Sequence, residues 1–282
     1  MPPVVWHILV TLAFAGGLRI QKRVFLGQPV SMGEAPWAVK IYKTTKNGVS
    51  GCSGTIIKEN WILTAAHCCQ NPGEMDYTLK LQVGWSPSKP PLTTTSKLCI
   101  THPNYNKLEM ETWGYDIGLI HLNEPLDISG TDVRAVDIPN TANVPAESSN
   151  LTFVGFGQTC DKTNFCERKP KLVHLTVERK QRWQRRYGHF GRKFLDQTFG
   201  ALNEKRQRTY RGDSGGGLIM FTNNQKTVVG IASGSPKVEN IQAPSIVVRV
   251  AAHLQWIHEV ILKVFPGEQV PKAGGLATES AQ

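Results

Sequence analysis

Short apolar stretches, each bounded by turn-forming residues, recur along the chain between residues 24 and 250. Gly, Pro, Asn and Ser separate these stretches, as expected for the turns between strands. The pattern therefore predicts an all-β protein, either a barrel or a sandwich. The predicted strands cover residues 37–42, 54–64, 79–83, 117–122, 152–156, 172–177, 217–221, 228–231 and 245–250.

The one clear helical period lies near the end of the chain. Leu254, Ile257, Ile261 and Val264 recur at intervals of three and four residues, which places them on one face of a helix. A Pro-Gly pair follows and ends the helix. The tail, residues 266–282, contains small and polar residues with little to bury, and it is predicted to be disordered.

The N-terminus carries an apolar run over residues 4–15 that ends in Ala-Phe-Ala, a pattern typical of a signal-peptidase site. The run is too short to cross a bilayer, so residues 1–15 are predicted to be a signal peptide. The alternative is a buried N-terminal segment. Six cysteines fit an oxidising compartment, and the protein is expected to be secreted, extracellular and not associated with a membrane.

Composition sets the size of the folded unit and reveals a local excess of charge. The 282 residues are 40% hydrophobic, enough for one large globular unit or two small ones. The formal net charge is +10, and residues 179–211 hold 11 basic side chains against two acidic ones, an excess of 11 − 2 = +9. The basic residues are Arg179, Lys180, Arg182, Arg185, Arg186, Arg192, Lys193, Lys205, Arg206, Arg208 and Arg211.

Two interpretations of this basic segment remain open. It is either a solvated surface with its aromatic residues turned inward, or a site for a polyanion. A secreted protein would meet a sulfated glycosaminoglycan or an acidic protein stretch there, and binding to nucleic acid is not expected.

Three short motifs carry the candidate chemistry. They are Leu-Thr-Ala-Ala-His-Cys at 63–68, Tyr-Asp-Ile-Gly-Leu-Ile at 115–120 and Gly-Asp-Ser-Gly-Gly at 212–216. Each alone has an ordinary structural explanation, but their joint occurrence in this order is specific. The intervals, 116 − 67 = 49 and 214 − 116 = 98, are ordinary for the chymotrypsin-like (trypsin-like) serine protease family, which the chain resembles over residues 24–265.

The resemblance implies two six-stranded antiparallel β-barrels with a C-terminal α-helix and an active site between the barrels. It implies that Ser214 is the nucleophile, that His67 is the general base and that Asp116 orients the imidazole. It also implies that the backbone N–H groups of Gly212 and Ser214 form an oxyanion hole. This chemistry requires no cofactor and no metal ion.

A basic stretch ahead of this region resembles the family's activation site. Cleavage after Arg23 would free the α-amino group of Val24, which would insert and pair with Asp213. Residues 16–23 would then form a short propeptide. The Phe-Leu pair at 25–26 departs from the small apolar residue and glycine usual in the family, and the alternative is a plain basic linker.

The six cysteines predict three disulfide bridges, and the lack of a suitable histidine spacing argues against a metal site. One pair is implied by the resemblance, because the family has a bridge beside the catalytic histidine. Another pair lies within one loop, and the third follows by elimination. The expected pairs are Cys52–Cys68, Cys160–Cys166 and Cys69–Cys99.

The residues that correspond to the family's primary specificity pocket do not favour cleavage after Lys or Arg. Arg208 stands where an aspartate gives that specificity, and neither Thr209 nor the facing Ser245 supplies a carboxylate. The far wall contains Ser233 and Ser235. Arg208 either recognises an acidic substrate side chain, points outward from a neutral pocket, or plugs the pocket and weakens cleavage.

Together these features predict a monomeric, secreted serine endopeptidase that is made as a zymogen and hydrolyses proteins or peptides through an acyl-enzyme. The other hypothesis is a catalytically weak protease homologue that binds a polyanion or a protein as a regulator. Asn150 opens an Asn-Leu-Thr sequon and is a candidate N-glycosylation site, although such tripeptides also arise by chance.

Overall fold

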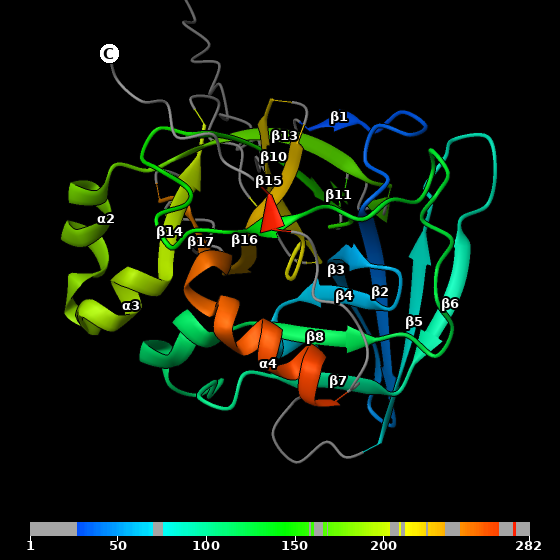
Figure 1. Cartoon of the computed structure of the whole chain (residues 1–282), viewed down its shortest axis with the longest axis horizontal. Coiled ribbons are helices and arrows are strands. Elements are labelled where there is room, and N and C mark those ends of the chain that lie inside the picture. The colour runs from blue at the N-terminus through cyan, green and yellow to red at the C-terminus, as the bar shows by residue number, and fades with distance from the viewer. Residues whose placement is uncertain are drawn as a thin grey trace, which may run out of the picture.

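The computed structural model describes residues 27–69, 76–157, 159–160, 166–167, 169–203, 209, 212–223, 225–234, 243–264 and 273–274. The chain is mostly β, in agreement with the pattern of short apolar stretches (Figure 1). The predicted signal peptide and propeptide lie outside the described residues. None of the helices in the described ranges is long and apolar enough to cross a membrane.

The first sheet is an antiparallel half-barrel that curls around its own apolar side chains. Its strand order is β6-β5-β2-β3-β4-β8-β7. The two edge strands, β6 and β7, follow each other in the chain with one residue between them. β6 pairs with β5 at one edge, and β7 pairs with β8 at the other. The strands are β2 (Ala38–Thr45), β3 (Gly48–Lys58), β4 (Trp61–Thr64), β5 (Tyr77–Val83), β6 (Leu92–Ser96), β7 (Leu98–Thr101) and β8 (Gly118–His121).

The second sheet closes into a six-stranded barrel, because β13 pairs with β14 as well as with β10. A short strand, β1, adds to β13 from outside this ring. Phe153, Leu175 and Val247 belong to the buried cluster inside the barrel. The strands are β1 (Gln28–Pro29), β10 (Asn150–Gly155), β13 (Lys171–Val177), β14 (Thr198–Leu202), β15 (Gly217–Thr222), β16 (Gln225–Gly234) and β17 (Ser245–Arg249).

A third apolar cluster joins residues of both sheets with the C-terminal helix. It includes Trp61 and Leu119 from the first sheet and Ile219 from the second. Ile257 and Ile261 bury the predicted apolar face of α4 (Leu254–Val264) in this cluster. This shared core holds the two sheets together and so fixes the position of the segments between them.

Residues 180–197 of the basic segment form a helical hairpin at one side of the second barrel (Figure 1). It consists of α2 (Lys180–Tyr187), η2 (Gly188–Phe190) and α3 (Gly191–Gln197). The sequence analysis did not predict these helices, although Trp183, Tyr187, Phe190 and Phe194 recur at helical intervals of three and four residues. These four aromatic residues pack together between the helices and the barrel.

The remaining elements are short. They are α1 (Ala66–Cys69), η1 (Met110–Tyr115), η3 (Val250–His253) and the strands β9 (Ile138–Pro139), β11 (Thr159–Cys160), β12 (Cys166–Glu167) and β18 (Ala273–Gly274). β18 lies in the tail that was expected to be disordered, and it pairs in parallel with β9. The rest of residues 265–282 lies outside the described residues.

Candidate active site

His67 and Asp116 meet at the edge of the first sheet. β4 leads into the one-turn helix α1, which carries His67, and η1 ends immediately before Asp116. The His67 Nδ1 atom lies 2.7 Å from Asp116 Oδ2, and the backbone N–H of His67 donates to Asp116 Oδ1 at 2.9 Å. The carboxylate therefore fixes both the backbone and the ring of the histidine.

The electrostatic environment of this pair favours a protonated imidazole. Burial by itself lowers the pKa of His67, but the charge of Asp116 and its hydrogen bond outweigh burial and raise the pKa above its ordinary value of 6.5. Lys107 and Lys43 oppose this rise weakly. Asp116 is itself 2% exposed, so its charge acts on the ring with little screening by water.

Ser233, at the end of β16, contacts the same carboxylate. Its hydroxyl donates a hydrogen bond to Asp116 Oδ2 at 2.5 Å. The sequence analysis placed Ser233 only in the wall of the specificity pocket and missed this contact. The spacing of residues could not reveal it, because the two side chains are separated by 117 positions in the chain.

The turn that contains Ser214 packs directly on the first sheet. The carbonyl of Ser214 accepts a hydrogen bond from the N–H of Ser53 at 2.8 Å and lies 3.5 Å from the sulfur of Cys68, the residue after His67. Gly215 has a φ of +85°, and a Cβ there would overlap Thr64 and Ser53. The glycine is therefore required both by the backbone conformation and by the close approach of the two sheets.

Gly212 also has a conformation that favours glycine, with a φ of +92°. Its carbonyl accepts a hydrogen bond from the hydroxyl of Ser53 at 2.9 Å. Within the part of the chain that the structure describes, no backbone carbonyl accepts a hydrogen bond from the N–H of Gly212 or Ser214.

Asp213 is fully buried between these residues. Its Oδ1 atom accepts a hydrogen bond from the N–H of Gly157 at 2.7 Å. A Cβ at Gly157 would lie 2.5 Å from the same oxygen, and one at Gly155 would overlap it. Two glycines of the Gly-Phe-Gly run at 155–157 thus make room for a buried carboxylate.

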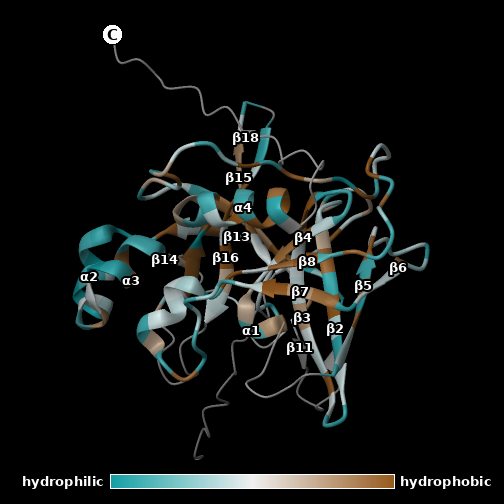
Figure 2. Ribbon diagram, turned by 60° about the horizontal axis from the view of Figure 1, so that its bottom comes forward, coloured by the Kyte–Doolittle hydropathy of each residue, from teal (hydrophilic) through white to brown (hydrophobic). Residues whose placement is uncertain are grey.

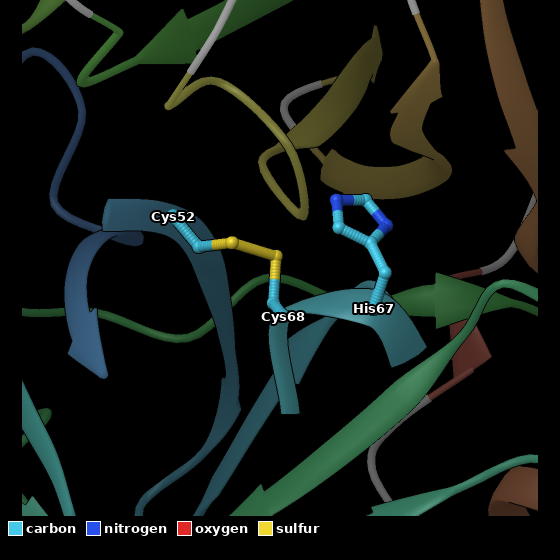
Figure 3. A group of neighbouring side chains, drawn as sticks. All are labelled: Cys52, His67 and Cys68. Atoms are coloured by element: carbon cyan, nitrogen blue, oxygen red, sulfur yellow. A yellow bond between two sulfur atoms is a disulfide. The ribbon is translucent and has the colours of Figure 1, made fainter. Parts of the chain in front are cut away.

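The disulfide bridges Cys52–Cys68 and Cys69–Cys99 are both present. The first lies beside His67, whose imidazole extends toward the yellow and gold ribbons of the second barrel (Figure 3). The sulfurs of Cys52 and Cys68 lie within 4.8 Å of a His67 ring nitrogen, but the bridge leaves them no thiolate with which to bind a metal. The backbones of Cys160 and Cys166 lie directly opposite each other in β11 and β12.

Two residues of the predicted specificity pocket contact each other. The N–H of Thr209 and its hydroxyl each lie 3.0 Å from the hydroxyl of Ser245, and both side chains are buried. Arg208 and Ser235 lie outside the described residues, as do Arg23 and Val24. Asn150 is exposed at the start of β10.

The chain is similar in sequence to known serine proteases. The family whose sequence pattern matches residues 24–257 is described as Trypsin. The chain is 30% identical to snake venom serine protease KN5 of Trimeresurus stejnegeri, over 90% of this chain and 93% of that protein. It is 26% identical to Trypsin Blo t 3 of Blomia tropicalis, over 91% of this chain and 97% of that protein.

The fold is also similar to that of a solved serine protease. Neuropsin, expressed in the limbic system of mouse brain, superposes with a TM-score of 0.69 at 21% identity. The superposition covers 84% of this chain and 99% of neuropsin. This likeness concerns the fold alone.

Proposed function

Because the chain belongs to the trypsin family of serine proteases, we propose that it is a secreted serine endopeptidase that acts through Ser214, His67 and Asp116. The observation that carries the proposal is the hydrogen-bonded pair of His67 and Asp116, with the Ser214 turn anchored beside Cys68. A serine hydroxyl needs a neighbouring base to become a nucleophile, and we assign that role to His67.

In the proposed reaction, Ser214 Oγ attacks the scissile carbonyl carbon while His67 accepts its proton. Asp116 stabilises the resulting imidazolium through the bond to Nδ1. The N–H groups of Gly212 and Ser214 donate to the oxyanion as the tetrahedral intermediate forms. His67 then returns the proton to the leaving amine, and water hydrolyses the acyl-enzyme by the same steps.

Labelling with a fluorophosphonate tests this proposal. Protein processed after Arg23 should be labelled at Ser214 and should cleave a casein substrate, whereas Ser214→Ala should do neither. Failure of folded, processed protein to react would instead favour a catalytically weak homologue with a regulatory role.

We propose further that the protein is made as a zymogen. Gly27 lies against Lys171 and Leu172 in β13, and Lys171 pairs with Gly155, which adjoins Asp213. The three steps along the chain from Val24 to Gly27 span about 10 Å when extended. β1 and β10 flank β13, so they lie two strand spacings, about 10 Å, apart. The new N-terminus is therefore within reach of Asp213.

The primary specificity is proposed to differ from that of trypsin. The hydroxyls of Thr209 and Ser245 are hydrogen-bonded to each other within the candidate pocket. A substrate cation would therefore meet neutral oxygens there instead of a carboxylate. A peptide library should therefore show no preference for Lys or Arg before the scissile bond. A strong preference for either would overturn this specificity.

The helical hairpin is the proposed site for an extracellular polyanion. Seven basic side chains are exposed on it and define a basic surface, and Figure 2 shows α2 and α3 as hydrophilic. Glu178 and Asp196 oppose them at 4.0 and 3.6 Å, which leaves a formal excess of 7 − 2 = +5. The seven are Arg179, Lys180, Arg182, Arg185, Arg186, Arg192 and Lys193.

The packing of the hairpin favours a sulfated polysaccharide over a single-stranded nucleic acid. Trp183 and Phe194 are 3% and 0% exposed, so their rings are not available as platforms on which bases could stack. The same buried rings hold the arginines on a rigid scaffold, which lowers the entropy lost when a ligand binds.

Heparin chromatography tests this site with a charge-matched control. Neutralising Arg182, Arg185 and Arg186 to Gln should lower the salt concentration needed for elution. The control changes Lys46, Lys80 and Lys97, which are exposed on the first sheet, to Gln and has the same net charge. Equal elution of both triple variants would show that net charge alone causes retention and would overturn the site.

A further inference from the structure

Ser53 lies in the first sheet, but its polar atoms hold the turn of the second barrel. Its backbone N–H donates to the carbonyl of Ser214 at 2.8 Å, and its hydroxyl donates to the carbonyl of Gly212 at 2.9 Å. We propose that Ser53 is a positioning residue that fixes the backbone carrying the two oxyanion donors. This inference rests on the function proposed above.

The orientation of the Ser53 hydroxyl is determined by its two backbone partners. A carbonyl can only accept and an N–H can only donate, so Oγ donates to Gly212 and accepts from the N–H of Phe156 at 3.2 Å. The carbonyl of Ser53 accepts from the hydroxyl of Thr64 at 2.9 Å. Every polar atom of Ser53 is engaged, and the residue is 0% exposed.

These bonds link three parts of the proposed site. Thr64 ends β4, three residues before His67. Phe156 lies between the two glycines that surround Asp213. Gly212 and Ser214 supply the oxyanion donors. Ser53 therefore links the strand that leads to the histidine, the 155–157 segment beside Asp213 and the nucleophile turn. Its hydroxyl bonds the last two, and its carbonyl bonds the strand.

Holding the carbonyls of Gly212 and Ser214 restricts the peptide planes between them. Gly212 has a φ of +92°, where a glycine has wide freedom, and no side chain of its own limits its ψ angle. The hydrogen bond from the Ser53 hydroxyl to the Gly212 carbonyl restricts this ψ angle from outside the turn. Oxyanion donors contribute only when they already point at the developing charge. Loss of the hydrogen bond from Ser53 should therefore slow catalysis.

Ser53→Ala removes the hydroxyl and leaves the backbone bond to Ser214 in place. We expect kcat to fall by about 5- to 50-fold, less than the loss of a whole donor, with KM changed less than about twofold. A peptide aldehyde, which forms a tetrahedral adduct with the serine, should lose affinity by the same factor as kcat.

Ser96→Ala is the matched control. Ser96 is also 0% exposed in the first sheet, and its hydroxyl donates to the carbonyl of His121 at 2.6 Å and accepts from the N–H of Leu98 at 3.0 Å. Its loss should lower stability comparably without changing kcat. Equal kcat values for Ser53→Ala and the wild type, or an equal loss of kcat in Ser96→Ala, would overturn the positioning role.

Hydrogen exchange tests the inference independently of catalysis. Amide exchange in the peptide spanning residues 212–216 should be faster in Ser53→Ala than in the wild type and unchanged in Ser96→Ala. This result would support the role of Ser53 even if wild-type protein failed to cleave any substrate, which would contradict only the proposed function. Unchanged exchange in Ser53→Ala would contradict the inference.

Discussion

At the scale of single residues, Asp116 accepts three hydrogen bonds with its two oxygens. The donors are the N–H of His67, the ring of His67 and the hydroxyl of Ser233. This arrangement fixes the position of the carboxylate and directs it at the imidazole. The pKa of His67 depends on it, because burial alone would move that pKa in the opposite direction.

Asp116→Asn should therefore change both the rate and its pH dependence. We expect kcat to fall by about ten-thousand-fold, the effect of this substitution in a Ser-His-Asp triad. In the wild type, kcat/KM should rise with pH through a His67 pKa above 6.5, because only the neutral ring accepts a proton. In the variant the midpoint should move below 6.5, since burial remains and the charge is lost.

A pH profile of kcat/KM between pH ~5 and ~9 checks both parts of this prediction. Ser233→Ala, which keeps the Asp116 charge and removes one hydrogen bond, should lose far less activity. An acidic midpoint that stays constant in Asp116→Asn would show that another group controls the profile.

The space that the Asp213 carboxylate occupies depends on the absence of a side chain at Gly155. Gly155→Ala would place a Cβ over Asp213 Oδ1 and force the buried carboxylate to move. Overpacking of this kind costs about 1–3 kcal/mol or more, and the displaced turn should also lose most of its activity. Gly130→Ala is the control, because a Cβ there meets nothing within 4 Å.

Urea unfolding and the rate of fluorophosphonate labelling measure the two effects of Gly155→Ala. The Gly130→Ala control should match the wild type in both assays. A Gly155→Ala protein with wild-type stability and labelling would mean that Asp213 tolerates displacement.

At the scale of elements, η3 meets η1 at a buried histidine. His253 Nε2 lies 2.8 Å from the carbonyl of Gly114, and the ring of His253 lies near those of His102 and Tyr115. Burial lowers the pKa of His253 and that of His102 to about 4, with Lys193 adding to the effect at His102. Both rings are therefore neutral in the folded protein at pH 7.

This contact should make the folded protein sensitive to mild acid. The unfolded chain binds protons at these histidines below pH 6.5, whereas the folded chain does so only near pH 4. The free energy of unfolding should therefore fall as the pH drops from 6.5 toward 4. His253→Gln, which keeps a donor for Gly114 but does not titrate, should show a smaller fall.

Urea midpoints at several pH values test this prediction, with His189→Gln as the control because His189 is exposed. The control should retain the full pH dependence. A His253→Gln protein with an unchanged slope of stability against pH would show that other groups cause the acid sensitivity.

The elements differ in how well the sequence predicted them. Strands such as β10 and β17 were predicted closely, because their apolar residues form short runs between turn signals. β6 was missed because Leu-Thr-Thr-Thr-Ser contains one apolar residue and lies at a sheet edge, where little is buried. The helices of the hairpin were missed because charge hid the helical spacing of their aromatic residues.

The site itself was only partly accessible from sequence. His67 and Asp116 come together as the resemblance implied, because motif order carries that information. The contacts of Ser53 and Ser233 join positions more than 100 residues apart, so they depend on how the two sheets pack. A pattern of apolar positions describes each sheet separately and cannot specify that packing.

At the scale of the whole molecule, the proposed activation acts on one fully buried carboxylate, Asp213. A buried charge is stable only when partners compensate it, and loss of one partner costs about 3–5 kcal/mol. Activation should add a charged partner to those that Asp213 already has, because cleavage after Arg23 creates an ammonium group on Val24. We therefore predict that cleavage raises both the activity and the melting temperature, the latter by several degrees.

Asp213→Asn and Arg23→Gln separate the two halves of this prediction. Arg23→Gln should resist the activating protease and remain inactive and less stable. Asp213→Asn should be cleaved normally but gain neither activity nor thermal stability, because the new ammonium finds no carboxylate. If Arg23→Gln reacts with fluorophosphonate as fast as processed wild-type protein, activation by an N-terminal ion pair is wrong, and the nucleophile turn is already in its active form before cleavage.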